Sequence, residues 1–216
     1  MDKTVAKMKN RDILTIRNVW GLYFMYKLCK TEQSAQRQRE LERGLLAAMG
    51  TRQYEEISVS DLCDQLGIPR KSFYRYFSSK DGALHALIDH TLLDYEAFPG
   101  TPKPGEKRTY QKDLERFFLF WKEQKPLLDA LVRSEISGVL VTRSIHHALS
   151  SAGTPTRFLQ QEEKVARENA TTFGICGLMS IVLSWHQGGY QIPVRQMAES
   201  VVQLLTKPLF SEADAY

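Results

Sequence analysis

The chain has 216 residues, 43% of them hydrophobic, with 13 glycines and 8 prolines, a composition that excludes a collagen-like, low-complexity or largely disordered protein. Its net charge of +4 is unevenly distributed: residues 1–80 hold 15 Lys/Arg against 9 Asp/Glu, and residues 81–216 hold 14 against 16. Because residues 1–80 are basic and residues 81–216 are slightly acidic, we expect a polyanion partner for the N-terminal part alone.

The sequence offers few signals of a membrane, metal or enzyme protein. The three cysteines have neither disulfide-framework nor zinc spacing, which fits a reducing cytosol. The apolar stretch 13–29 is interrupted by polar and charged residues, so we expect neither a membrane span nor a signal peptide. Neither His85/His90 nor His146/His147 has a metal-ligand spacing, and no catalytic triad or phosphate loop is indicated. We expect a cytoplasmic protein that is not an enzyme and has no metal or cofactor.

Residues 1–34 are interpreted as an N-terminal extension, and three interpretations of its role are open. It contains an apolar stripe at helical spacing, which indicates packing on the rest of the chain or on a second chain: Ile13, Ile16, Trp20 and Phe24. The 7 Lys/Arg against 3 Asp/Glu in residues 1–35 equally indicate a basic arm. Translation from Met25 is the third interpretation.

From there on, apolar residues recur at helical spacing, and no alternating strand pattern runs longer than a few residues. We therefore predict an all-α protein with about eight or nine helices. The breaks between them fall at Gly67–Pro69, Pro99–Gly105, Pro126, Gly153–Pro155, Gly188–Gly189 and Pro193.

The first two helices of a compact unit are predicted from their buried faces and ends. Residues 36–50 place Leu41, Leu45, Leu46 and Met49 on one face, and Tyr54 and Ile57 cover the far end of that helix. Ser58 is the expected N-cap of a short helix with Asp61 in its first turn. That helix buries Val59, Leu62, Cys63 and Leu66 and stops at Gly67.

The next helix, Pro69–Phe77, has a thin apolar edge and a dense polar face. Phe73 and Phe77 are four residues apart, so we expect them to pack together against the preceding helices. The remaining face is basic, aromatic and polar: Arg70, Lys71, Ser72, Tyr74, Arg75 and Tyr76. This composition fits a helix that enters a DNA groove, and it equally fits a solvated surface helix of a bundle.

The run from Ser58 to Leu84 resembles the DNA-binding head of the tetracycline-repressor (TetR/AcrR) family. The matching features are Gly67-Ile68, Phe73-Tyr74, Tyr76-Phe77 and Lys80-Asp81 followed by Leu84. The match covers about residues 37–88. Leu66 stands where the family usually has a small residue, and Pro69 stands where it usually has Ser or a similar residue.

The resemblance implies a three-helix helix-turn-helix head at residues 35–82 and a larger helical regulatory and dimerisation body at residues 83–216. It makes Arg70, Lys71 and Arg75 the candidate base readers. The resemblance also implies that six further residues take part in DNA binding, with contacts to the DNA backbone rather than to base edges: Ser58, Ser60, Ser72, Tyr74, Tyr76 and Lys80.

The body is predicted to contain helices after the helix of residues 80–98, with one around 114–121, one after Pro126 and one around 136–145. Aromatic residues there are candidates for lining a ligand pocket, although simple core packing explains each of them singly: Tyr95, Phe117, Phe118, Trp121 and Phe173.

Two C-terminal helices, about Pro155–Gln187 and one after Pro193, are implied by the resemblance to form a four-helix dimer interface. The expected interface residues are Gly174, Gly177, Met197, Val201 and Leu204. The other interpretation of the glycines is close packing within one chain. A two-fold dimer would match a palindromic operator.

The sequence and the resemblance therefore predict a DNA-binding transcriptional regulator, a homodimer tuned by a small hydrophobic or amphipathic effector. Its partner is double-stranded operator DNA. The resemblance implies repression as the usual outcome, and activation is the open alternative. One rival interpretation gives the body a protein partner instead of a small molecule, which an exposed apolar patch without an enclosed cavity would favour. Another is an enzyme on a helical scaffold, which requires a buried polar cluster in a cleft.

Overall fold

The computed structural model describes residues 25–100, 109–151 and 161–206. The apolar stripe expected in residues 13–24 lies outside the described residues. So do residues 101–105 of the expected loop and residues 155–160, where the long helix was expected to start.

Within the described residues the chain forms nine α-helices and one short 3-10 helix, and the only strand-like pairing is an isolated bridge between Tyr26 and Phe77. The prediction of an all-α fold is confirmed. The elements are α2 (Glu32–Met49), η2 (Tyr54–Glu56), α3 (Val59–Gln65), α4 (Arg70–Tyr74), α5 (Lys80–Glu96), α6 (Tyr110–Glu123), α7 (Lys125–Arg133), α8 (Ser137–Ser151), α9 (Gln161–Gln187) and α10 (Val194–Thr206).

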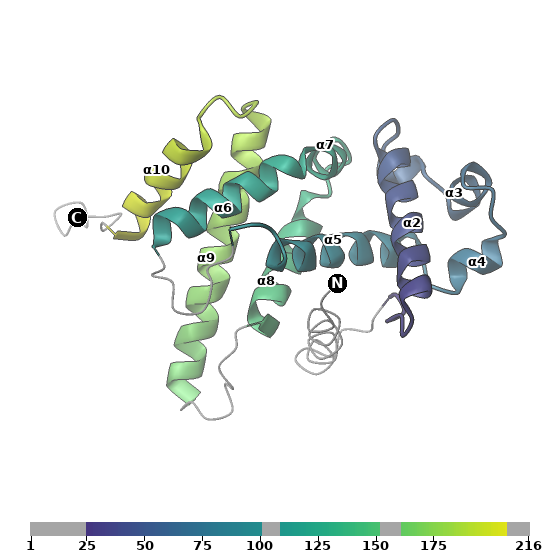
Figure 1. The fold of residues 1–216 in the computed structure, drawn as a ribbon, viewed down its shortest axis with the longest axis horizontal. Coiled ribbons are helices and arrows are strands. Elements are labelled where there is room, and N and C mark those ends of the chain that lie inside the picture. Colours follow the sequence, from purple (N-terminus) through teal and green to yellow (C-terminus); the bar gives the residue numbers. More distant parts are fainter. Residues whose placement is uncertain (1–24, 101–108, 152–160, 207–216) are drawn as a thin grey trace.

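The helices gather at two ends of the molecule, and α5 runs between them (Figure 1). We call residues 25–79, with α2, α3 and α4, the head, and residues 109–206, with α6 to α10, the body. Helix α5 packs on α2 in the head and on α8 in the body, while α8 packs on α9 and α6 on α10. One continuous helix therefore connects the two ends. The boundary predicted between residues 82 and 83 falls in its first turn and stays a prediction.

The first head helix begins at Glu32, four residues before the predicted start at residue 36. The reason is Thr31, whose side-chain oxygen accepts a hydrogen bond from the Ser34 backbone N–H at 3.2 Å and so satisfies one of the free donors at the helix start. The predicted boundary between residues 34 and 35 therefore falls within the first turn of α2.

The head has its own apolar core. Leu41, Leu45 and Met49 of α2 are buried, and Tyr54 and Ile57 close the end of this helix as predicted. The bulky Leu66 fits because it packs over Gly44 of α2, where an added Cβ would lie 2.7 Å from the Leu66 methyl groups. The absence of a side chain at residue 44 thus accommodates a large one at residue 66.

Among the helices of the described ranges, none has the length and apolar character that crossing a membrane requires.

A substitution at Gly82 tests how closely the start of α5 approaches the segment before α2. An alanine Cβ at this position would lie 2.1 Å from the carbonyl oxygen of Met25. Because backbone cannot yield as a flexible side chain can, we expect Gly82→Ala to lower the free energy of unfolding by about 1–3 kcal/mol in urea denaturation.

The matched control is Gly138→Ala in the first turn of α8, where no atom lies within 4 Å of the added Cβ. It is expected to leave stability unchanged or to raise it by up to about 1 kcal/mol. Equal stabilities for Gly82→Ala and the native protein would contradict the close approach.

Candidate nucleic-acid interface

Helix α3 is built as the sequence predicts. Ser58 is its N-cap: the Asp61 backbone N–H donates to the Ser58 hydroxyl oxygen at 3.1 Å, and the Ser58 backbone N–H donates to the Asp61 carboxylate at 3.2 Å. Hydrogen bonding of the Asp61 carboxylate to the side chain and to the backbone N–H of Ser58, together with the nearby Arg52 and Arg70, holds the pKa of Asp61 below its usual value. Gly67 follows the helix with a φ of +63°, a left-handed conformation that glycine adopts without a Cβ penalty.

Helix α4 is anchored to the head by two phenylalanines. Phe73 and Phe77 are buried, with ring centroids 5.1 Å apart, as their spacing predicts. The opposite side of α4 and the residue after it expose three charged side chains, Arg70, Lys71 and Arg75, and also Tyr74, which is 55% exposed. The helix therefore presents a basic, aromatic face on a fixed apolar base.

Arg70 is oriented by the neighbouring helix. Its guanidinium donates a hydrogen bond to the Ser60 hydroxyl of α3. This contact brings together two residues predicted for DNA binding from different helices. Ser58 is also exposed, but its hydroxyl is already engaged in capping α3.

Two of the residues predicted to contact DNA make their contacts inside the head in this structure. Tyr76 is only 8% exposed, because the chain leaves the helical path after Tyr74 and turns this side chain inward. Lys80 donates to the Tyr54 carbonyl oxygen at 2.6 Å, and its ammonium group lies 4.1 Å from the centre of the Tyr54 ring. Both side chains are thus engaged within the head.

The end of α4 is held by the segment that precedes α2. The Lys27 backbone N–H donates to the Tyr76 carbonyl oxygen at 2.7 Å, and the Ser78 N–H donates to the Met25 carbonyl oxygen at 2.8 Å. Tyr26, between these contacts, bridges to Phe77. Sequence analysis missed this segment, since a pairing of two or three residues has no periodicity to reveal it.

A buried carboxylate connects this segment to the body. Asp89 of α5 accepts a hydrogen bond from the Tyr26 hydroxyl at 2.6 Å and another from the Arg143 guanidinium of α8 at 2.7 Å. Asp89 and Arg143 form an ion pair with side chains 11% and 14% exposed. Burial and the Asp89 charge raise the pKa of Tyr26 far above its usual value, so Tyr26 remains a donor.

The only sequence signal for this site is an aspartate among the apolar residues of α5. Asp89 follows the fully buried Ile88 and is itself 8% exposed. Aspartates are seldom buried without a partner, so this position indicated a partner without identifying it.

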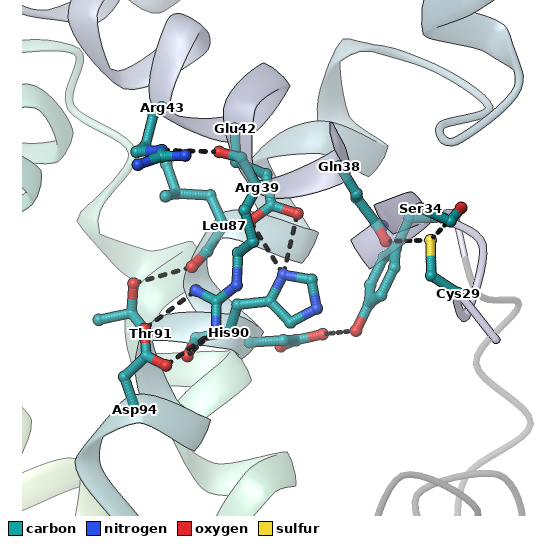
Figure 2. A network of polar contacts seen from close by, with 12 residues as sticks. Cys29, Ser34, Gln38, Arg39, Glu42, Arg43, Leu87, His90, Thr91 and Asp94 are labelled. Carbon is teal, nitrogen blue, oxygen red and sulfur yellow. Dashed lines mark hydrogen bonds and ion pairs between the residues drawn. The ribbon is translucent and has the colours of Figure 1, made fainter. Parts of the chain in front are cut away.

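A second set of polar contacts joins α2 to α5 (Figure 2). Arg39 binds Asp94 through two hydrogen bonds of 2.8 and 2.9 Å. The buried Glu42 lies 2.9 Å from His90 Nδ1 through both of its carboxylate oxygens. His90 therefore has a structural partner in α2.

The sequence of the head matches a known family. Residues 45–87 match the pattern described as "Bacterial regulatory proteins, tetR family". The chain is also 36% identical over 76 residues to the HTH-type transcriptional regulator EthR of Mycolicibacterium smegmatis, a match that covers 32% of this chain and about a third (33%) of EthR.

The head of this chain is thus that of a tetR-family regulatory protein.

The fold agrees with this assignment of the head. It resembles the fatty acid degradation regulator FadR from Bacillus halodurans with a TM-score of 0.51 and 15% identity, over 84% of this chain and 98% of that one. At this identity the likeness concerns the fold alone. It extends beyond the head into the body of this chain.

Four of the five residues predicted to line a ligand pocket lie in one aromatic cluster of the body. The Phe117 ring contacts the rings of Tyr95, Phe118 and Trp121, with centroids 5.4–6.4 Å apart. Phe118 and Trp121 are buried completely or nearly so. Phe173 on α9 is 74% exposed, so this structure does not bring it into the cluster.

The residues predicted for the dimer interface divide into two groups. Among residues 25–100, 109–151 and 161–206, no atom lies within 4 Å of a Cβ added at Gly174 or Gly177, so neither glycine serves close packing within this described part of the chain. Met197 and Val201 are 7% and 3% exposed because α10 packs on α6 of its own chain. They are therefore corrected to residues of the protomer core, whereas Leu204 is 46% exposed.

The contribution of Asp89 to the free energy of unfolding can be compared with that of Asp94, which lies on the same helix and also pairs with an arginine. Asp89→Ala leaves Arg143 buried without its partner, so we expect the free energy of unfolding to fall by about 3–5 kcal/mol. Asp94 is 58% exposed in its pair with Arg39, and Asp94→Ala is expected to cost about 1 kcal/mol or less.

Urea denaturation at neutral pH measures both losses. Similar small losses in the two variants would show that the Asp89 contacts contribute no more than a surface ion pair.

Proposed function

We propose that this protein is a sequence-specific DNA-binding transcriptional regulator that acts as a homodimeric repressor and is controlled by a small effector. The observation that carries the proposal is α4, a helix fixed by Phe73 and Phe77 that exposes Arg70, Lys71, Tyr74 and Arg75. The match of the head to this family supports a DNA-binding helix over a helix that is only a solvated part of a bundle. Operator DNA is then the polyanion expected for the basic N-terminal part of the chain.

In this proposal α4 enters the major groove. Arg70, Lys71 and Arg75 read base edges, and guanine is the preferred partner of an arginine that donates two hydrogen bonds. Ser72 and Tyr74 contact the phosphate backbone and fix the register of the helix on the duplex. Ser60 supports Arg70 through their hydrogen bond and so restricts the directions in which Arg70 can donate.

Dimer formation is proposed along the free side of α9 with the end of α10. Large apolar side chains are exposed there at Phe173, Leu204 and Leu205, and the open positions of Gly174 and Gly177 permit close approach of a second backbone. A two-fold dimer would present two heads to half-sites about one helical turn of DNA apart, roughly 34–36 Å. Sedimentation velocity tests this step, and a monomer at micromolar concentration would contradict it.

Control by an effector requires that the body and the head move together. The ion pair of Arg143 with Asp89, and the bond from Tyr26 to Asp89, support such coupling because they join α8 to the end of α4. A small hydrophobic or amphipathic molecule that binds one arrangement of the body more tightly would shift the population toward it. A compound screen for release of bound DNA tests this step. Compounds that bind the body and leave DNA affinity unchanged would argue against it.

Selection of binding sites from random duplexes tests the proposed function directly. We expect the full-length protein to enrich a palindromic sequence with half-sites one helical turn apart. Fluorescence anisotropy should then show tighter binding to this duplex than to a scrambled one, with affinity that falls steeply as salt rises. Recovery of no preferred sequence by an intact, folded protein would contradict specific DNA binding.

Arg70→Ala tests the assignment of base readers. We expect it to weaken binding to the selected duplex by about 1–3 kcal/mol and to relax sequence preference at one position of each half-site. The control is Arg195→Ala in the body, where the side chain is 82% exposed and should contribute nothing. Unchanged affinity and unchanged preference in Arg70→Ala would remove Arg70 from the set of base readers.

A further inference from the structure

Next to α4 the head contains an open groove of about 910 Å³, and most of the residues that line it are not among the predicted DNA-binding residues. One wall is the segment before α2 with Lys27 and Lys30, and the other is the end of the α4 region with Arg75 and Tyr76. The first turns of α2, including Arg37, complete it. The groove therefore begins where the proposed recognition surface ends.

The position of this groove relative to α4 is fixed by backbone contacts. Lys27 donates its backbone N–H to the Tyr76 carbonyl, while the neighbouring Tyr26 points inward and is bound to Asp89. Because side chains alternate in an extended segment, the inward position of Tyr26 directs the Lys27 side chain outward. Lys27 is exposed accordingly.

The groove carries uncompensated positive charge. Within the described part of the chain, the ammonium groups of Lys27 and Lys30 and the guanidinium of Arg75 have no carboxylate within 4.0 Å. Arg37 differs, since it pairs with Glu40 at 2.7 Å. These three positive charges lie on backbone held in place beside α4, the helix proposed to face DNA. The groove is therefore suited to bind a further stretch of the same DNA backbone.

We propose that this groove binds the phosphodiester backbone of the operator next to the major groove that α4 enters, with Lys27 and Lys30 as its phosphate contacts. The inference rests on the proposed function and extends the DNA-binding surface to the segment before α2. Contacts of this kind position the protein without reading sequence, since phosphates are the same at every base pair. Their contribution is therefore uniform across sequences and sensitive to salt.

The test is Lys27→Gln combined with Lys30→Gln in the full-length protein. The control is Lys112→Gln combined with Lys122→Gln, which removes the same charge from exposed positions on α6, a helix of the body that does not line the groove. Anisotropy titrations with the selected and scrambled duplexes are run over a salt series. Thermal unfolding verifies that both double variants are folded, as expected for exposed side chains.

We expect the Lys27/Lys30 variant to lose affinity by a similar factor on both duplexes. The slope of log affinity against log salt should become shallower by about 1 per lysine for each bound protomer. The control should match the native protein, and Lys27→Arg with Lys30→Arg should retain the native slope.

Native affinity and slope in the Lys27/Lys30 variant would overturn the inference while leaving the proposed function intact. A loss confined to the selected duplex would also overturn it, because it would mean that these lysines read sequence. Failure of the native protein to bind duplex DNA at all would overturn both proposals together.

Discussion

The arrangement of this protein depends on how it satisfies one buried carboxylate. Asp89 lies among apolar residues of α5, and an isolated charge there would be strongly destabilising. Its two partners come from different parts of the chain: Arg143 from α8 of the body and Tyr26 from the segment before α2. The requirement to pair this charge therefore fixes a body helix and a head segment against the same turn of α5.

The consequences reach the proposed recognition helix through short, identifiable contacts. Tyr26 is followed by Lys27, whose backbone holds the Tyr76 carbonyl just after α4. A second attachment lies at the other end of the head, where Arg133 of α7 donates to the Met49 carbonyl at 2.9 Å and also to the Gly50 carbonyl at 2.6 Å. Since α7 and α8 are consecutive, a shift at their junction would act on the head at both attachments. This is the kind of physical link that control of DNA binding from the body requires.

The parts that sequence analysis predicted well are those governed by local rules. The cap at Ser58, the stop at Gly67 and the buried pair of Phe73 and Phe77 each depend on residues within one turn of each other. Predictions that assumed an uninterrupted helix were less accurate. Tyr76 was expected on the exposed face of a helix to Phe77, but α4 ends at Tyr74 and the side chain turns inward.

Contacts between distant segments could not be predicted, because periodicity gives the buried face of a helix but not the neighbour that covers it. Met197 and Val201 form an apolar stripe that suits either a second chain or the same chain, and α6 of the same chain covers them. The partners of Asp89 are separated from it by 63 and 54 residues. Only the fold brings such residues together.

Native-state amide hydrogen exchange in Arg143→Met tests most directly whether the body holds α4 in place through Asp89. Two amides report on the attachment: Lys27, bound to Tyr76, and Ser78, bound to Met25. Losing a charge-assisted bond worth about 1.5–3 kcal/mol should speed their exchange on the order of tenfold or more. The Ile68 amide, bound to Cys63 within the head, should change much less. Equal protection of Lys27 and Ser78 in the variant and the native protein would contradict the account.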